Sequence, residues 1–560
     1  MPKAAFWKTD WFLGVLASAL IFLALSGDLL QSLERKAYDM GVQASSRTPS
    51  ERIAVIAIDE PSIANLGRWP WPRDLHARLN DLLAGAPAKV IGNTIFFSEA
   101  QIDPGYNYIQ RLTEILQEST PEGETPAPSA EREKIAALLA EAEIKLNTDR
   151  ALAERYGKSA NVLLPMLFQL GEMRGRPDKV LPDFVLRNRL TNLSSEDGRM
   201  PEAQTIQYPI EVLAAQAQGL GHLNATPDVD GGIRREPLLV RYADQVFPSL
   251  ALMIAAKSLN LGVPDIRVSA GQELRLGKLR IATDAHTQMY PFFYRESGGR
   301  PPFQVDSFYD VLNGKIPASK YAGKIVLIGA TAAGVGAAQV TPVSPAMPPV
   351  LTLAHTVSSI LQDHFFLTPP LAHWASLADF LLISLYITVL LPRLSAGLGA
   401  FTTLLLLAGL LGAHFSLMLG VGMWIQLMGA TVLLVVGHLL LTTKRFLVTE
   451  RGKEKSELDS AESNRMLGLA FQGQGQLDMA FDKFRKCPMD EGLMENMYNL
   501  ALDYERKRQF NKAEAVFRYM TDFIPKFRDL AERLARSKQL SDTVLLGGAR
   551  GQTAGGTVIL

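Results

Sequence analysis

Arg52-Ile-Ala-Val-Ile-Ala-Ile-Asp59 is an apolar run bounded by charged side chains, and Lys89-Val-Ile-Gly-Asn-Thr-Ile-Phe96 is a second run of the same kind. Continuous apolar runs of this length are typical of parallel strands that are covered on both faces. Between them, residues 73–84 show the apolar spacing of a helix, so we predict a strand–helix–strand unit. Further runs at 162–168 and 324–329 predict additional buried strands. We therefore expect residues 31–370 to form an α/β domain.

One part of this domain has a different character. Residues 103–156 are charged and compatible with helices, and a segment rich in Pro, Glu and Thr interrupts them at 120–128. Such a segment is typical of a loop rather than of a packed core. We therefore predict a helical insertion that protrudes from the domain at about 103–156.

Apolar stretches on both sides of the α/β domain predict four membrane helices, one before it and three after it. The first covers residues 11–30 and is short in its uncharged part, since a span needs about 17–25 residues. A cleaved signal peptide is the alternative. A helix-compatible stretch at 29–40 continues without a break, which favours an uncleaved anchor. The other three lie within 371–442, at about 374–391, 398–419 and 423–441.

The positive charges around these stretches predict their orientation. Arg393 lies in the first short connector, and a basic cluster follows the last stretch: Lys444, Arg445, Arg451, Lys453 and Lys455. Because cytoplasmic segments carry the excess of Lys and Arg, residues 1–10 and the part after 442 are expected in the cytoplasm. The α/β domain would then face the periplasm of a bacterial cell. Its lack of cysteine fits, because Cys487 is the one cysteine in the sequence.

Asp379, His414 and His438 lie inside the apolar stretches. Ionisable groups in a membrane are energetically unfavourable and usually contact a partner within the helix bundle. We interpret these three as polar contacts that orient the helices. A transporter pathway is the alternative, which three scattered positions favour only weakly.

Two neighbouring stretches near the end of the sequence carry the same sparse pattern, about 33 residues apart. The pattern resembles tetratricopeptide (TPR) repeats, in which small residues let paired helices approach and large residues fill the groove. We therefore expect an all-α TPR domain with a capping helix at 464–540. A helical connector would precede it at 443–463, and a flexible Gly-rich tail would follow at 541–560. The expected packing residues are Leu467, Gly468, Phe471, Ala480 and Phe484 in the first repeat, and Leu500, Ala501, Tyr504, Ala513, Phe517 and Pro525 in the second.

A second resemblance covers roughly residues 35–367. Its motifs occur in a set order: Ala57-Ile-Asp59, Gly67-Arg-Trp-Pro-Trp-Pro-Arg73, Gly221-His-Leu-Asn224 with Pro227-Asp-Val-Asp-Gly231 and Ile233-Arg-Arg235, Phe247-Pro-Ser-Leu-Ala251, and Gly323-Lys-Ile-Val-Leu-Ile-Gly-Ala-Thr331. This region resembles the CHASE type-2 domain, a class of sensory extracellular domains associated with cyclases and histidine kinases. The resemblance implies extracytoplasmic sensing, one membrane helix before the domain and three after it. It also implies an output through histidine kinases, serine/threonine kinases or nucleotide cyclases.

Two groups of residues are candidates for ligand contact. In the stretch 67–73, the tryptophans could stack on a ligand and the arginines could pair with an anion. The alternative is a rigid turn whose tryptophans cover the edge of the core. The acidic pair after the first strand lies where open α/β sheets bind ligands, but it could equally cap the following helix. The candidates are Asp59, Glu60, Arg68, Trp69, Trp71 and Arg73.

Several other patterns are better explained without a ligand. The glycine-rich stretch 329–336 follows a strand but lacks the Lys-Ser/Thr pair of a phosphate-binding loop. Asp228-Val-Asp230-Gly231 resembles part of a calcium loop, but no Glu completes the ligand set, so we expect a tight turn. His222 and His355 lack metal-ligand spacing and are interpreted as structural. We expect no metal, no cofactor and no catalytic residues, and the formal net charge of zero argues against nucleic acid as a partner.

Together these patterns predict a multidomain membrane receptor that acts as a homodimer. An unknown periplasmic ligand would shift the membrane bundle, and the TPR repeats would bind a cytoplasmic protein. We expect the output to be a serine/threonine kinase, either beyond Leu560 or on a separate chain, by analogy of architecture. The alternatives are a cyclase or histidine-kinase output, or a TPR scaffold for an envelope complex that senses nothing.

Overall fold

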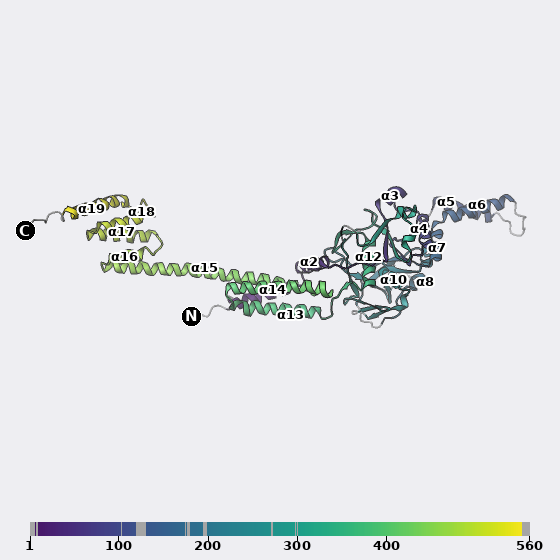
Figure 1. Cartoon of the computed structure of the whole chain (residues 1–560), viewed down its shortest axis with the longest axis horizontal. Helices are drawn as coiled ribbons and strands as arrows, with labels where there is room; N and C mark the ends of the chain where they lie inside the picture. Colours follow the sequence, from purple (N-terminus) through teal and green to yellow (C-terminus); the bar gives the residue numbers. More distant parts are fainter. Residues whose placement is uncertain are drawn as a thin grey trace, which may run out of the picture. The chain divides into compact units, whose positions relative to one another are not determined.

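The computed structural model describes residues 6, 9–101, 103–118, 130–173, 175, 180–193, 199–269, 273–296, 298 and 301–550. The chain divides into two compact units, Met1–His438 and Leu439–Leu560. The first unit contains a mixed α/β domain and apolar helices, and the second unit is helical (Figure 1).

Within the described residues, a sheet of nine strands forms the centre of the α/β domain. The strands β13, β1, β14, β2 and β3 follow one another in parallel, and β5 also pairs in parallel with β3. The four apolar runs predicted as buried strands are β1, β2, β3 and β14. The path is β13 (Gln304–Ser307), β1 (Ile53–Ile58), β14 (Ile325–Ala330), β2 (Val90–Asn93), β3 (Val162–Leu170), β4 (Glu202–Gln207), β7 (Leu239–Tyr242) and β8 (Gln245–Pro248), with β5 (Gly219–His222) beside β3.

Both faces of the sheet are buried, which explains why its strands are apolar without alternation. In β1, Ile53 and Val55 belong to one core and Ile56 and Ile58 to the other. Helices cover each side because successive side chains of a strand point to opposite faces. One face packs against α10 (Leu250–Ser258) and α12 (Pro349–Gln362); the other packs against α4 (Arg73–Gly85), α7 (Thr148–Ser159), α9 (Glu211–Gln216) and α11 (Phe308–Leu312).

Short elements complete the domain around this sheet. The helices α3 (Glu60–Leu66) and α8 (Asp183–Leu186) are single turns or little more, as are the 3-10 turns at Val263–Asp265 and Ala318–Tyr321. The remaining strands form small antiparallel sheets. These are β9 (Ile266–Ser269) with β10 (Glu273–Leu276) and β11 (Leu279–Ala282); β6 (Glu236–Pro237) with β12 (Gln288–Pro291) and β17 (Phe365–Phe366); and β15 (Gln339–Thr341) with β16 (Ser344–Met347).

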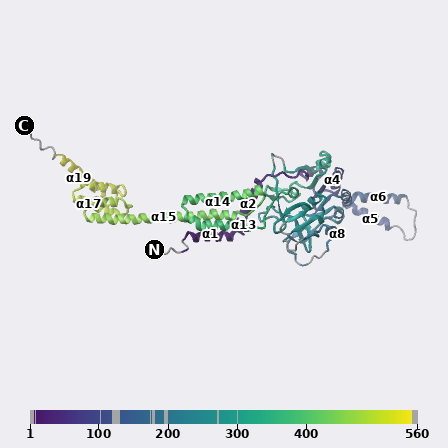
Figure 2. The same cartoon turned by 60° about the horizontal axis from the view of Figure 1, so that its bottom comes forward.

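The predicted insertion is shorter than expected. Helices α5 (Pro104–Glu118) and α6 (Ala130–Leu146) pair with each other and project from the domain (Figure 1, Figure 2). The next helix, α7, belongs to the core instead, because Leu152 and Tyr156 are buried against the sheet. The insertion therefore ends near residue 147 rather than 156, and the Pro-rich segment 120–128 lies outside the described residues.

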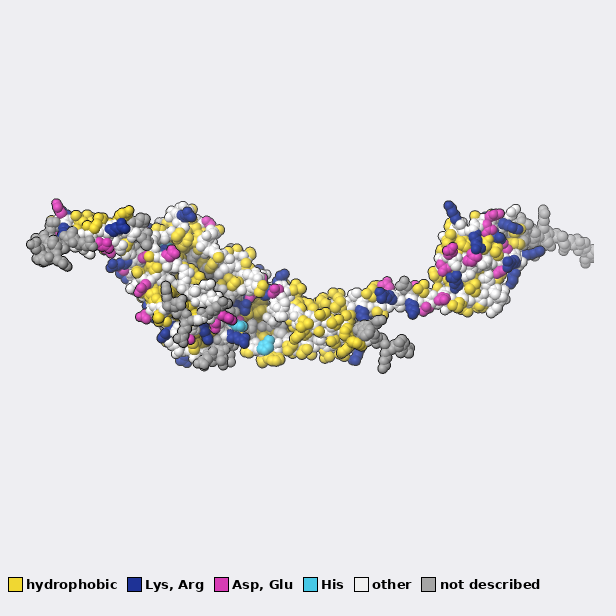
Figure 3. Space-filling model, turned by 180° about the vertical axis from the view of Figure 1, so that it is seen from behind, with side chains coloured by type: hydrophobic (Ala, Val, Ile, Leu, Met, Phe, Trp, Pro, Cys, Tyr) yellow, Lys and Arg dark blue, Asp and Glu magenta, His cyan; other side chains and the backbone are white. Residues whose placement is uncertain are grey.

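Within the described residues, three helices after the α/β domain are long and apolar enough to cross a membrane. They cover Ala372–Arg393, Ala396–Val421 and Met428–Gly473, and they correspond to α13 (Ala372–Leu385), α14 (Ala396–Ser416) and α15 (Met428–Gly473). Helices α13 and α14 each continue through one π-helical turn, at Tyr386–Leu390 and Leu417–Val421. Both helices lie beside the first part of α15, and the face shown in Figure 3 is largely hydrophobic there.

The expectation of a continuous helix at the N-terminus is wrong. Helices α1 (Asp10–Ala24) and α2 (Asp28–Ala44) meet at an angle of 76°, and they would count as one span only as a bent pair. Gly27 has an extended backbone and starts a new helix, while the Gln31 side chain donates to the free Leu25 carbonyl at 2.8 Å. A glycine followed by Asp is a helix-start signal, and here it interrupts the apolar pattern.

Two of the three ionisable residues in the apolar helices make the interhelical contacts that we expected. His438 Nδ1 lies 2.9 Å from the Thr403 hydroxyl, and His414 Nε2 lies 3.1 Å from the Ala37 carbonyl of α2. Asp379 has one buried carboxylate oxygen for which the described residues provide no partner.

The second unit is built from helix pairs. The end of α15 is followed by α16 (Leu477–Phe484), α17 (Glu491–Arg506), α18 (Phe510–Thr521) and α19 (Leu530–Arg550). Gly468 allows close packing, because a Cβ there would lie 2.5 Å from the Phe484 ring. Of the expected packing residues, Ala480, Phe484, Leu500, Ala501, Tyr504, Ala513 and Phe517 are buried in one core, and Phe471 packs against it.

Three details of this unit differ from expectation. Leu467 is 45% exposed and Pro525 lies in an exposed turn, so neither packs in the core. Helix α19 continues to Arg550, ten residues beyond the expected end of the capping helix at 540, so the first half of the predicted flexible tail is helical. Residues 551–560 lie outside the described part.

Gly221 gives a direct test of the sheet packing. A Cβ on this residue of β5 would lie 2.6 Å from the Leu250 Cα and 2.7 Å from its backbone nitrogen, so α10 would have to move. We expect Gly221→Ala to lower the unfolding free energy of the full chain in detergent by about 1–3 kcal/mol. Gly85→Ala is the matched control, because nothing lies within 4 Å of its Cβ position. Equal thermal midpoints for the two variants would contradict the close approach of α10.

Candidate functional site

A cavity of about 600 Å³ opens at the carboxyl ends of the parallel strands. Its walls come from segments that follow strands β2, β5 and β14, including Phe96, Leu223 and Val335, and from the start of α12. Open α/β sheets bind ligands at this edge, and the volume is that of a small-molecule site. The fold therefore forms a ligand-sized cavity where its topology predicts one.

The cavity contains polar atoms that nothing in the described structure satisfies. Glu236 of β6 is 8% exposed, and burial raises the pKa of its carboxyl to about 8. Gln339 Oε1 of β15 and Thr352 Oγ1 of α12 are buried and have no hydrogen-bond partner among the described residues. Buried polar groups are normally hydrogen-bonded, so these oxygens mark a place where a ligand or water can bind.

Two of the six candidate residues lie at this cavity. Trp69 and Arg73 line it, and the guanidinium of Arg73 is held in place by Asp149, whose Oδ1 lies 3.1 Å from Nε. Arg73 also lies over the Phe97 ring, 4.5 Å from its centroid. Trp71 is 1% exposed and packs in the core against Phe308, with its Nε1 donating to the Gly67 carbonyl at 2.8 Å.

The other three candidates contribute to local structure. Asp59 caps α3 by accepting from the Ser62 amide at 3.0 Å, which is the capping alternative considered for it. The Glu60 carboxylate accepts from the Ala333 amide at 3.0 Å. Arg68 is exposed and is not part of the cavity wall. The stretch 67–73 thus acts partly as a turn over the core and partly as a wall of the cavity.

Glu236, Gln339 and Thr352 were missed in the sequence. They come from three elements that are distant in the chain, and no spacing pattern connects them. Glu236 had no local signal either, because it follows Arg234 and Arg235 at the charged end of the apolar run Pro237-Leu-Leu-Val240.

The buried histidines have structural surroundings. Burial lowers the pKa of His76, His222 and His355 to about 3, so each is neutral near pH 7. His355 Nδ1 accepts from the Tyr294 amide at 3.0 Å. Within the described residues, no group of three or more His, Cys, Asp or Glu side chains is placed to hold a metal ion.

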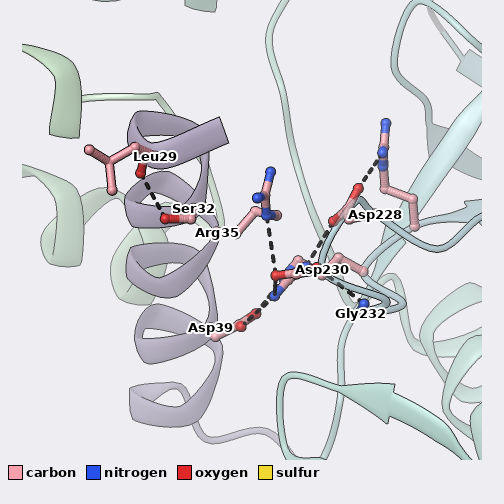
Figure 4. Close-up of polar contacts among 9 residues, drawn as sticks. Leu29, Ser32, Arg35, Asp39, Asp228, Asp230 and Gly232 are labelled. Carbon is pink, nitrogen blue, oxygen red and sulfur yellow. Dashed lines mark hydrogen bonds and ion pairs between the residues drawn. The ribbon is translucent and has the colours of Figure 1, made fainter. Parts of the chain in front are cut away.

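A buried ionic cluster joins the α/β domain to α2 (Figure 4). The guanidinium of Arg234 pairs with Asp39 of α2 at 2.7 Å and with Asp228 and Asp230 at 2.9 Å each, and its side chain is 7% exposed. Arg35 of α2 also pairs with Asp230, at 3.2 Å. The hydrogen bond from Arg234 lowers the pKa of Asp230 to about 2. The predicted tight turn at 228–231 is present and supplies two of these carboxylates.

On its other side, α2 contacts the apolar helices. The Glu34 carboxylate accepts from the amides of Met428, at 2.6 Å, and Gly429, at 3.3 Å, which begin α15. The ring of Tyr38 lies 4.9 Å from that of Trp424, just before α15, and both belong to the core shared with the sheet. The residues of α2 that contact α15 and those that contact the α/β domain therefore lie within about one and a half turns of the helix.

The first unit thus combines an α/β domain that contains a ligand-sized cavity with helices that are long and apolar enough to cross a membrane. The model of one family, the CHASE2 domain, matches residues 15–391, and the chain belongs to this family. The family assignment indicates a membrane signalling receptor. No curated protein and no solved structure matches the chain significantly.

The raised pKa of Glu236 predicts how stability depends on pH. The folded chain holds this proton up to about pH 8, whereas an unfolded Glu releases it near 4.5. The contribution of Glu236 to stability is therefore complete below pH 4.5 and is lost as the pH rises through 8. We expect Glu236→Gln to match the wild type at pH 5 and to exceed it at pH 9 by on the order of 3 kcal/mol.

The measurement is thermal unfolding of the full chain in detergent between pH 5 and 9. Glu211→Gln, on the exposed first turn of α9, is the matched control and should follow the wild type throughout. A constant difference between Glu236→Gln and the wild type across this range would show that Glu236 is not the titrating group.

Proposed function

We propose that the chain is a receptor of a bacterial inner membrane. In this proposal the α/β domain lies in the periplasm and binds a small ligand in the cavity at the edge of its sheet. The membrane helices then carry the change to the cytoplasmic helical unit, which binds a protein partner. A homodimer would allow two arrangements of the membrane helices. To shift the balance between them, the ligand must bind the receptor more tightly in one arrangement than in the other.

One observation carries this proposal: a single short segment connects the cavity to α2. Arg234 holds Asp39 of α2, and Glu236, two residues later, lines the cavity. Arg235 between them pairs with Asp228 of the same ionic cluster. A ligand that displaces Glu236 would therefore act on the backbone that positions Arg234. Arg234 in turn holds α2, and Glu34 of α2 accepts a hydrogen bond from the Met428 amide at the start of α15.

The proposed topology rests on charge and on the packing of α1. The basic residues after the apolar part of α15 support a cytoplasmic location for the second unit. In this proposal α1 with α2 forms a fourth span, so that both ends of the chain would lie on the same side of the membrane. Support comes from contacts between α1 and the α13 region: Ser18 accepts from the Ser384 hydroxyl at 2.8 Å, and a Cβ on Gly14 would lie 3.0 Å from Thr388.

The second unit supports the proposal of TPR repeats through its own geometry. Gly475 and Arg508 both have positive φ angles, 76° and 54°, and each is followed by a glutamine that precedes a helix, Gln476 and Gln509. These features recur with the 33-residue offset of the sequence pattern. We propose a protein partner for this unit and, by architectural analogy alone, a serine/threonine kinase as the output.

Hydrogen exchange can test the path through α2. Arg234→Met leaves Asp39, Asp228 and Asp230 without their shared partner, which should release α2 from the domain. We expect the amides of Met428 and Gly429, which Glu34 protects, to exchange at least about tenfold faster in the full chain in nanodiscs. Arg275→Met is the control, because Arg275 is an exposed side chain that pairs with Glu273 on the neighbouring part of its own strand.

If exchange at Met428 and Gly429 stays unchanged while that around Asp39 rises, α2 does not connect the two regions. That result would favour the alternative of a scaffold that assembles an envelope complex without sensing.

The orientation has a separate test in whole bacterial cells that express the full chain. In a Cys487→Ala background, a membrane-impermeant maleimide should label Ser319→Cys, which is exposed on the α/β domain, in intact cells with a permeable outer membrane. It should label Ser456→Cys, exposed on α15, only after the inner membrane is opened. The reverse pattern would overturn the proposed topology.

A further inference from the structure

The cavity at the sheet edge contains unsatisfied acceptors. Glu236 lines it with a carboxyl that has no hydrogen-bond or ion-pair partner among the described residues, and burial alone shifts its pKa. Gln339 Oε1 and Thr352 Oγ1 are buried oxygens that also lack partners within the described structure. Gln339 Oε1 can only accept hydrogen bonds, and a cation beside Glu236 would favour the ionised form of its carboxyl, which accepts as well.

The side-chain donors of Arg73 and Asn224 in the cavity wall are already engaged. The Arg73 guanidinium pairs with Asp149 at 3.1 Å and donates to the Glu99 carbonyl at 3.1 Å. The side-chain amide of Asn224 donates to the Phe168 carbonyl at 2.6 Å and its oxygen accepts from the Phe168 amide. Of the charged side chains in the wall, Glu236 and Glu99 are acidic and Arg73 is neutralised by Asp149. The charged side chains of the wall therefore favour a cationic ligand over an anionic one.

The rest of the wall is apolar. Trp69, Phe96, Leu167, Leu223 and Leu353 line the same cavity. Such a wall favours a ligand with an apolar body, and an indole ring such as that of Trp69 can also attract a cation placed over its face. The cavity therefore combines one acidic acceptor group with an apolar enclosure.

We propose that this cavity binds a small organic amine, with its ammonium group on Glu236 and Gln339 and its apolar body against Trp69 and Phe96. This inference rests on the proposed sensor function and specifies the ligand class of that sensor. An ammonium carries three donors, and Glu236, Gln339 and Thr352 each provide an acceptor in the cavity wall. In the empty cavity burial keeps Glu236 protonated near pH 7, and an ammonium group beside it would stabilise the ionised carboxylate by pairing with it.

The test is calorimetric titration of the full chain in nanodiscs at pH 7 with matched ligands that differ only in one group. Tryptamine, tryptophol and indole-3-acetate present an ammonium, a hydroxyl and a carboxylate on the same ring system. Hexylamine, hexanol and hexanoate do so on a flexible chain. We expect at least one amine to bind and to exceed its neutral and anionic analogues by at least about tenfold in affinity.

Variants locate the binding. Glu236→Gln should weaken binding of the amine by at least about tenfold, and Gln339→Leu should weaken it less, because it removes a neutral acceptor. Glu211→Gln, outside the cavity, should bind like the wild type, and an unchanged thermal midpoint at pH 5 shows that each variant is folded. The inference is overturned if both amines fail to bind, if an analogue binds as well as its amine, or if Glu236→Gln retains full affinity.

A second readout separates this inference from the sensor function. Hydrogen exchange at Met428 and Gly429 is measured with and without the amine. If the amine binds at Glu236 and exchange there is unchanged, the ligand class stands and transmission through α2 fails. If neither amine binds but Arg234→Met still alters exchange at Met428, the ligand class fails and the path through α2 stands.

Discussion

The contact between the α/β domain and α2 depends on one buried guanidinium, that of Arg234. Arg234, whose side chain is 7% exposed, pairs with three carboxylates, from Asp39, Asp228 and Asp230, and burial of this guanidinium without partners would carry a large energetic penalty. Two of these carboxylates belong to a turn of the α/β domain and one belongs to α2. The ion pairs therefore fix the position of α2 relative to the domain. Replacement of such a cluster by apolar residues would often be tolerated in terms of stability, so its value lies in specifying this one arrangement.

The parts of the fold that sequence reasoning recovered are those with a strong local pattern. The runs at β1, β2, β3 and β14 are apolar throughout because both faces of the sheet are buried, and this can be read residue by residue. The order of the strands cannot be read in this way. Strand β14 inserts between β1 and β2 although more than two hundred residues separate it from either, and no local feature of Ile325–Ala330 records its neighbours.

The candidate site shows the same division. Trp69 and Arg73 were found because they belong to an unusual local string, and Trp71 of the same string turned out to be a core residue. Sequence alone does not separate these roles, since both surfaces accept tryptophan. Glu236, Gln339 and Thr352 meet only through tertiary structure, so no motif could have joined them. The bend at Gly27 was missed for the opposite reason: its local signal was present, but the apolar pattern around it outweighed a single glycine.

The length of α1 has a consequence for the membrane itself. Its 15 residues extend about 22 Å, whereas the hydrocarbon core of a bilayer is about 30 Å thick. As a span, α1 would be too short beside the 22 and 26 residues of the next two helices. A bilayer relieves such a hydrophobic mismatch by thinning or by tilting its helices, and here the tilt would change the 76° angle at which α2 leaves α1. Lipid composition would thereby act on the same helix that Arg234 holds, as a mechanical input independent of any ligand.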